Sequence, residues 1–432
     1  MYAHQSAVIG QFCHSRAEVV GASRFFNNDS ATLPGLLEAC LTGSEHAGRD
    51  VLCIQDTTEL NYERNRGKLD TSDDELGPVG NDKNIGFFLH PSLVLDAGSG
   101  FALGYGHVHM WNRSWDKGSK HEREYKRLPL NQKESYRWLD SSLKARERLR
   151  EAASVTIIAD READIYEEFA LIPDAKTHLL IRSRCDRITE NGHLYSQLAS
   201  TAPCGSYTIK LKGSKKRKQR KAKLLVRYTQ VVIKKPKTAR SENLPETVSL
   251  YAIEVREEGP SENPVLWRLL TTHQISSFED AKQIIHYYSQ RWNIEQLFRL
   301  LKNKGLCIEN SQIEEGIALK KLAVLALMIA LVLLQLVSER DADAKEKADV
   351  LFDEEQQSFL IRAQAGLEGK TVKQQNPHSR HSLAWAIWLI ARLGGWDGYG
   401  RASPPGPITM KRGMVQFASQ YQGWLLAQKS RE

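Results

Sequence analysis

Two short apolar runs, each followed at once by an aspartate, predict buried β-strands in the first half of the chain. Residues 50–55 (DVLCIQ) lead into Asp56, and residues 154–159 (SVTIIA) lead into Asp160. Runs of this length, rich in aliphatic and β-branched residues, are typical of strands buried on both faces. We therefore expect both aspartates to stand at strand ends.

The rest of the pattern predicts a mixed α/β core interrupted by a β-rich segment. From about residue 185 to 267 short strands alternate with charged turns, and a further strand is expected at 267–271. The elements expected outside that segment are short helices in 1–48, a hairpin of strands 87–95 and 101–110, a helix in 132–152, a helix from 161 through 169 and a strand at 178–183.

A long helix is predicted after the strand at 267–271. Ser276 followed by Glu279 matches a capping box, and Gly305 is a typical helix stop. A helix of about 30 residues is long for a globular protein, so a break near 288–292 is considered as well.

This helix has two contrasting faces. Tyr288, Arg291, Glu295 and Lys302 follow one another at i, i+3, i+7 and i+14, which places them within an arc of about 60°. A solvated charged face is the ordinary explanation, so a functional face needs support from elsewhere in the chain. Largely opposite lie the apolar side chains of Ile294, Leu297 and Leu301.

A second helix, further along the chain, is strongly apolar. Residues 322–334 contain no polar side chain. They are too few to span the roughly 30 Å of a bilayer core, so we expect a buried core helix and no membrane partner. Beyond residue 341 the chain is helical again, with a proline-rich interruption at 404–407.

Composition and charge favour a globular protein of several domains with a polyanionic partner. The chain has 432 residues, 41% of them hydrophobic, and a net charge of +8. Residues 210–240 hold 14 Lys and Arg in 31 positions. This basic run suits contacts to a DNA backbone, with a solvated hairpin loop as the alternative. Six cysteines without CxxC spacing argue against a zinc site and against a disulfide framework.

Asp56 and Asp160 are candidates for a metal site. Carboxylates at adjacent strand ends can meet in space, and a third from a packed helix would complete a cluster. Close carboxylates repel one another unless a cation neutralises them, and oxygen ligands suit Mg²⁺ or Mn²⁺. Two such ions serve phosphoryl transfer. Each aspartate taken alone is better explained as a turn former or a helix N-cap.

Three sequence blocks together resemble a known family. They are residues 54–58 (IQDTT), residues 160–164 (DREAD), and the Y-x2-R-x3-E-x6-K block from Tyr288 to Lys302. In this order they are similar to the signature blocks of the DDE transposases of the insertion-sequence-4 family, most closely those of the transposon-five type. The similarity extends from about residue 24 to residue 396, nearly the whole chain.

The resemblance implies both a fold and an activity. The fold is α/β: a ribonuclease-H-like mixed sheet with helices, interrupted by a β-rich insertion and followed by a C-terminal helical region. Asp56, Asp160 and Glu295 would form the catalytic triad and hold two Mg²⁺ or Mn²⁺ ions. The enzyme would cut DNA at transposon ends and join those ends to target DNA.

The resemblance also implies contacts with DNA. Tyr288, Arg291 and Lys302 would contact phosphates near the cut. Trp267 would stack on a flipped-out base, a position in the strand core being the alternative. Arg182, on the strand after the second aspartate, would face phosphate. Further DNA-binding candidates lie in the basic run: Lys215, Lys216, Arg217 and Lys218.

The implied partners are transposon-end and target DNA and a second copy of the chain in a synaptic complex. The implied location is the bacterial cytoplasm, at the nucleoid. The domains expected are a remnant of an N-terminal helical DNA-binding region (1–48), the catalytic core in two parts (49–185 and 273–340), a β-rich insertion (186–272) and a C-terminal helical dimerisation region (341–432).

The N-terminal region departs from the family. Only 55 residues precede Asp56, where the family carries a helical domain that recognises DNA ends. The alternative function is therefore a shortened, non-cutting relative that inhibits or regulates a full-length transposase. The presence of all three triad residues, Asp56, Asp160 and Glu295, favours the active enzyme.

Overall fold

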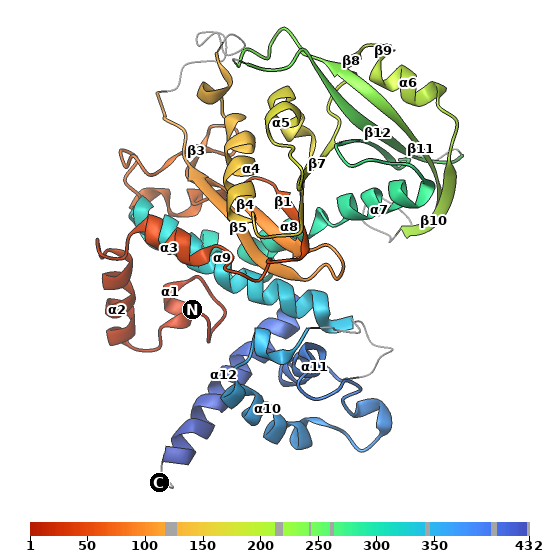
Figure 1. Cartoon of the computed structure of the whole chain (residues 1–432). Helices are drawn as coiled ribbons and strands as arrows, with labels where there is room; N and C mark the ends of the chain where they lie inside the picture. Colours follow the sequence, from red (N-terminus) through yellow and green to blue (C-terminus); the bar gives the residue numbers. More distant parts are fainter. Residues whose placement is uncertain are drawn as a thin grey trace.

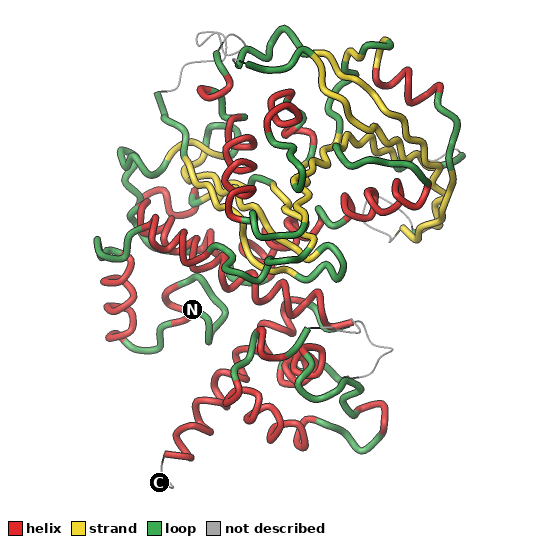
Figure 2. Tube along the Cα trace, in the orientation of Figure 1, coloured by secondary structure: helices red, strands yellow, loops and turns green. Residues whose placement is uncertain are grey.

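The structure is a computed structural model of the chain, shown in Figure 1. It describes residues 1–116, 128–211, 219–241, 243–259, 263–341, 346–398 and 404–429. A sheet forms the centre of the molecule, helices cover it, and a separate group of helices follows towards the C-terminus (Figure 2).

The centre of the sheet has a ribonuclease-H-like arrangement of five strands. The two strands that were predicted to end at aspartates, β1 (Asp50–Gln55) and β6 (Ser154–Ala159), are confirmed and pair in parallel. On the far side of β6 lies β7 (Thr177–Arg182), also parallel. On the far side of β1 the predicted hairpin, β4 (Asn84–Asp96) and β5 (Ala102–Trp111), runs antiparallel.

The β-rich segment continues this sheet. The last of its strands, β13 (Leu266–Thr271), pairs antiparallel with β7. Next come β12 (Thr247–Glu257) and β11 (Arg220–Lys234), so the sheet has 13 strands in all among the described residues. The segment also contains a helix, α6 (Leu194–Ser200), that the strand pattern did not predict. The remaining strands are β2 (Thr58–Asn61), β3 (Gly77–Val79), β8 (Ile188–Thr189), β9 (Gly192–His193) and β10 (Gly205–Leu211).

Helices cover both faces of the central sheet. The neighbouring positions Tyr105 and Gly106 on β5 show which helix covers each face. The Tyr105 hydroxyl donates a hydrogen bond to the carbonyl of Leu327 in α9 (Gly316–Ser338). At Gly106 an added Cβ would lie 3.3 Å from Ala145 of α4 (Tyr136–Arg148), so the glycine allows that helix to pack closely.

The apolar helix predicted at 322–334 is α9. Among the described residues it is the one helix whose length and composition would suit a membrane span, and 72% of its most apolar window is buried inside the protein. It packs against β5 and α3 (Leu33–Cys40). These contacts agree with the predicted core helix.

The predicted long helix is divided into three segments. α7 (Phe278–Ser289) begins with a capping box formed by Ser277 and Asp280, one residue after the predicted pair. α8 (Trp292–Arg299) follows a break at residues 290–291 and runs into a π-helical turn, Leu300–Lys304. The prediction of one straight helix over this stretch was therefore wrong, and the break falls where it was considered.

The helix predicted from 161 through 169 is also divided. A 3₁₀ turn, Arg161–Ala163, is followed by Asp164 and Ile165 in non-helical conformations, and α5 (Tyr166–Leu171) begins only then. Asp164 accounts for the interruption, because its buried carboxylate accepts hydrogen bonds from Arg187 and from the backbone of Arg184.

The two ends of the chain are helical. The N-terminal helices pack near α9, and the C-terminal ones form a bundle with an aromatic centre around Phe359 and Phe417. The elements are α1 (Ile9–Phe12), α2 (Arg16–Phe26), α10 (Glu354–Leu367), α11 (Leu383–Leu393) and α12 (Pro407–Lys429), with 3₁₀ turns at Glu63–Lys68, Leu130–Gln132, Ile308–Asn310, Glu339–Asp341, Ala348–Val350 and Val372–Gln374.

Candidate active site

Asp56 and Asp160 stand at the same edge of the sheet. Each directly follows its strand, and the register pairs Ile54 with Ile158, two residues before each aspartate. Because β1 and β6 are parallel neighbours, their carboxyl ends meet at one edge. The backbone N–H of Thr57 donates to Asp56 Oδ1 at 2.8 Å and fixes that carboxylate.

Arg291 joins Asp56 to Glu295. Its Nη1 lies 3.2 Å from Asp56 Oδ2, and its Nη2 forms an ion pair with Glu295 one turn further along. The burial of Ile294 and Leu297, on the opposite side of α8, holds the charged side of the helix against the sheet edge. The apolar side predicted for the helix is thus the buried one.

Tyr288 reaches the same edge from the other side of the helix break. Its hydroxyl donates to Asp160 Oδ1 at 3.2 Å, and its ring is almost wholly buried. The indole of Trp267 packs edge-on against this ring, with centroids 5.5 Å apart. Trp267 is partly buried: it packs against the hydrophobic core and also lies beside the candidate site.

Burial dominates the electrostatics of this edge. It raises the pKa of Asp56 to about 6, even though the Thr57 N–H and the Arg291 guanidinium both act to lower it. Burial also acts to lower the pKa of Arg291, but the surrounding Tyr288, Glu295, Asp160 and Asp56 reverse this, so its pKa is raised. Arg291 therefore stays charged and neutralises part of the carboxylate cluster.

The three carboxylates form an all-oxygen donor set, which suits Mg²⁺ or Mn²⁺. Their oxygen atoms are not all as close to one another as the ligands of a bound metal ion would be. Within the described residues, the one group of three His, Cys, Asp or Glu ligands lying within 4.8 Å of one another is elsewhere, at His107, His109 and Asp140. At the sheet edge, the Arg291 guanidinium supplies the positive charge between Asp56 and Glu295.

One comparison with known proteins bears on this edge of the sheet. Residues 137–333 match the family model of the transposase DDE domain. The match covers somewhat under half of the chain. It includes Asp160, Glu295 and Tyr288 and begins after Asp56. It supports a DDE transposase, and with it a transposase function, a DNA substrate and the divalent metal ions that such enzymes generally use.

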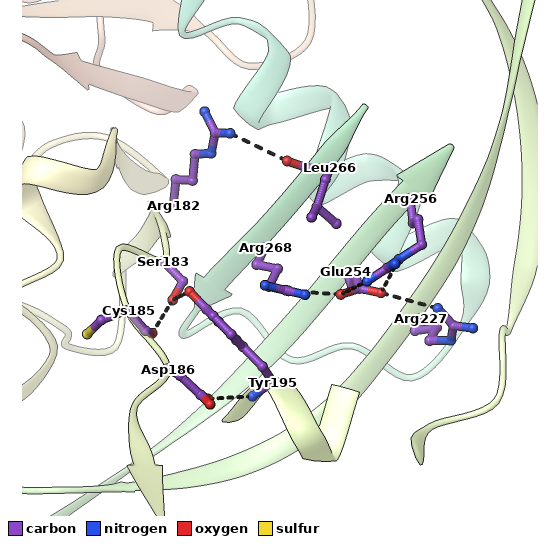
Figure 3. Close-up of polar contacts among 10 residues, drawn as sticks. All are labelled: Arg182, Ser183, Cys185, Asp186, Tyr195, Arg227, Glu254, Arg256, Leu266 and Arg268. Atoms are coloured by element: carbon purple, nitrogen blue, oxygen red, sulfur yellow. Dashed lines mark hydrogen bonds and ion pairs between the residues drawn. The ribbon is translucent and has the colours of Figure 1, made fainter. Parts of the chain in front are cut away.

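Two further residues that were predicted to contact DNA, Arg182 and Lys302, have partners within the protein. Arg182 Nη1 lies 3.8 Å from Asp160, and its Nη2 donates to the carbonyl of Leu266, a contact shown in Figure 3. Lys302 forms an ion pair with Glu309 at 3.4 Å and lines a cavity of about 560 Å³. Arg182 thus joins the carboxylate edge, whereas Lys302 lies in this neighbouring cavity.

The basic run is only partly described. Lys215, Lys216, Arg217 and Lys218 lie outside the described residues. At the start of β11, Arg220 donates to both carboxylate oxygens of Glu257 at 2.8 Å, so this arginine holds two strands together.

Sequence reasoning missed a cluster of arginines around Glu254, inside the residues that match the family model. Figure 3 shows its carboxylate, on β12, between three guanidinium groups. Arg227 lies 3.2 Å from it, Arg256 3.1 Å and Arg268 2.9 Å. The guanidinium of Arg268 also lies 3.9 Å from the ring centroid of Tyr195. Glu254 lies directly opposite Arg268 on β13 and two residues before Arg256 on β12. The sequence alone does not reveal this grouping, because it depends on how the strands are paired.

Arg137 was missed as well. At the start of α4 it donates to Thr57 Oγ1 at 3.1 Å and to Glu162 at 2.7 Å. It therefore joins the two sequence blocks that contain Asp56 and Asp160. Nothing in the spacing of the sequence marks this residue.

Proposed function

We propose that this chain is a DNA transposase of the insertion-sequence-4 family, of the transposon-five type, that cuts at transposon ends and joins them to target DNA. The observation that carries the proposal is the Arg291 bridge between Asp56 and Glu295, with Asp160 held beside it by Tyr288. Elements far apart in sequence bring these three carboxylates to one edge of the sheet, and the DDE domain match contains two of them.

Asp56, Asp160 and Glu295 would hold two Mg²⁺ or Mn²⁺ ions. When bound, these ions would activate the attacking oxygen and stabilise the leaving oxygen. The protein's own cations would position the DNA. Arg182 lies beside Asp160, and Arg291 lies between the other two carboxylates, so both can bind a scissile phosphate once the carboxylates are neutralised.

Trp267 and the basic run would bind the rest of the DNA end. Trp267 is partly exposed beside Tyr288, where its ring can stack on an unpaired base; such stacking contributes about 1–3 kcal/mol. The basic run and Lys302 would contact the DNA backbone. The C-terminal helices (341–432) would pair two copies in a synaptic complex. The proposal keeps the other domain boundaries of the sequence analysis: 1–48, 49–185 with 273–340, and 186–272.

The experiment uses duplexes made from the two ends of the element that encodes this chain, incubated with the protein and Mg²⁺ or Mn²⁺. Products are sized on a denaturing gel. We expect strand cleavage by the unchanged chain and by Glu279→Gln, a control on the exposed side of α7. Asp160→Asn and Glu295→Gln should bind the duplex at low salt without cutting it.

Two results would overturn the proposal. Undiminished cleavage by Glu295→Gln would exclude the triad. Binding without cleavage by the unchanged chain, in either metal, would instead favour the alternative function, a non-cutting relative of a transposase.

A further inference from the structure

A second group of metal-ligating side chains lies away from the three carboxylates, between β5 and α4. His107 and His109 are two residues apart on β5, and Asp140 is on α4, which packs against that strand. Each of the three offers one ligand atom, and these atoms lie within 4.8 Å of one another. All three residues are partly buried.

The donor set differs in kind from that of the candidate active site. Two imidazoles and one carboxylate suit a borderline transition ion such as Zn²⁺, which commonly takes three protein ligands and a water. His107 Nε2 is buried and has no hydrogen-bond partner among the described residues. A neutral imidazole binds a metal ion through a ring nitrogen that carries no proton, so an unpartnered ring nitrogen is available as a ligand.

We propose that His107, His109 and Asp140 form a binding site for one divalent transition-metal ion of the Zn²⁺ type. The ion joins α4 to β5. Ligand atoms around tetrahedral zinc lie about 3.4 Å apart. The three ligand atoms lie within 4.8 Å of one another, so small side-chain rotations are enough to reach the bound arrangement.

The Lys144 ammonium would compete with a metal ion for the Asp140 carboxylate. One turn after Asp140 on α4, its ammonium lies 2.8 Å from Asp140 Oδ2 and neutralises the carboxylate. Lys144 and His107 both line a cavity of about 640 Å³, which gives an ion and its water access to the group. An ion bound here would displace Lys144 from the carboxylate or use the second carboxylate oxygen.

The site is connected to the sheet edge that carries Asp56. His109 stands opposite His90 across β4 and β5, and His90 Nδ1 is 2.9 Å from Thr57 Oγ1. Arg137, three residues before Asp140, donates to the same Thr57 hydroxyl. Fixing α4 against β5 would thus steady Thr57, whose N–H holds Asp56. The proposed metal site does not depend on the proposed transposase activity, and its test measures metal binding alone.

The test uses the full chain carrying Asp160→Asn and Glu295→Gln, which removes the carboxylate site as a competing ligand. Zn²⁺ affinity is measured by competition with a chromophoric chelator, and Co²⁺ is added in parallel to record visible absorption. We expect one ion per chain and the intense visible bands of four-coordinate Co²⁺.

Matched variants in that background decide the ligands. His109→Gln and Asp140→Asn should each weaken Zn²⁺ binding about 100-fold or more and abolish the Co²⁺ bands. Lys144→Met should tighten binding several-fold. His193→Gln removes an exposed histidine that is also paired with a carboxylate, and it should leave Zn²⁺ affinity and the Co²⁺ bands unchanged.

Thermal unfolding shows whether a variant that fails to bind Zn²⁺ is still folded. Zn²⁺ should raise the Tm of the parent and of Lys144→Met, and leave that of Asp140→Asn unchanged. Asparagine keeps the size and shape of Asp140, which is only partly buried, so this last variant is expected to fold. The proposal is overturned if the parent shows no saturable binding, or if His109→Gln and Asp140→Asn bind Zn²⁺ as the parent does.

Discussion

Arg291 lies 3.2 Å from Asp56, although 235 positions separate the two residues in the sequence. The contact fixes α8 against the end of β1. Because the same guanidinium also pairs with Glu295, one cation neutralises carboxylates from two separate elements. Metal ions bound at these carboxylates would take over that neutralisation and release Arg291 for a phosphate.

Replacing Arg291 with alanine should destabilise the metal-free protein and increase the stabilisation that Mg²⁺ provides. Without the guanidinium, partly buried carboxylates repel one another with no counter-ion; we expect a loss of about 1–2 kcal/mol, since the pair retains some solvent. Thermal unfolding with EDTA and with Mg²⁺ measures both effects. Arg299→Ala, on the exposed side of the same helix, should show neither, and a Mg²⁺-induced shift equal to that of the unchanged chain would contradict the prediction.

Asp56 should make a measurable contribution to the pH dependence of stability. Its pKa is raised to about 6 by burial, so the folded protein holds this proton more tightly than the unfolded chain does. Stability then falls as pH rises from about 4 to about 6 and is level above that range. Asp56→Asn should flatten this part of the profile by about 1–2 kcal/mol, allowing for partial exposure.

Urea unfolding at several pH values between about 4 and 7 measures that difference between the two proteins. Asp50→Asn, at the opposite end of the same strand, serves as the control and should keep the full slope. Parallel profiles for the unchanged chain and Asp56→Asn would contradict the assignment of this titration to Asp56.

Tyr288→Phe should separate the role of the hydroxyl from that of the ring. The ring keeps its packing against Trp267, but Asp160 loses its hydrogen bond. We expect cleavage to slow about tenfold, equivalent to 1.4 kcal/mol, with a stability loss of about 1 kcal/mol. Single-turnover cleavage and thermal unfolding measure the two quantities. Tyr287→Phe, on the neighbouring residue, should leave cleavage unchanged, and unaltered cleavage by Tyr288→Phe would show that the hydroxyl does not position Asp160.

The central strands could be predicted from sequence because their signal is local. Residues 50–55 and 154–159 are continuous apolar runs, and the structure has strands at those residues. The helix pattern was less reliable where side chains compete with the helix. Asp164 binds Arg187 instead of continuing a helix, and the single helix predicted from 276 to 304 is interrupted at residues 290–291.

Contacts between elements account for what the sequence could not predict. Glu254 meets its arginines only because β12 pairs with β11 on one side and β13 on the other. His107 and His109 alternate on one strand, but Asp140 reaches them only when α4 packs on β5. The argument against a zinc site rested on the spacing of the cysteines. The sequence alone does not show that the Asp140 carboxylate lies beside the two histidines. The Asp56–Arg291–Glu295 grouping could be proposed beforehand only because the three sequence blocks resemble those of a known family.

Glu254→Gln should be among the most destabilising single substitutions in the β-rich segment. The buried carboxylate lies within 3.2 Å of Arg227, Arg256 and Arg268, and burial of the carboxylate is more than offset by the arginine hydrogen bonds, so its pKa is lowered. Glutamine keeps the shape but leaves three cations without their anion, at a cost of about 2–4 kcal/mol. Urea unfolding should show this loss, and added salt should recover part of it by screening the arginines from one another.

Glu246→Gln serves as the control. It removes an exposed carboxylate paired with Lys235 and should change stability by less than about 0.5 kcal/mol. Equal stability of the two variants would mean that the arginines are held by their strands and not by Glu254.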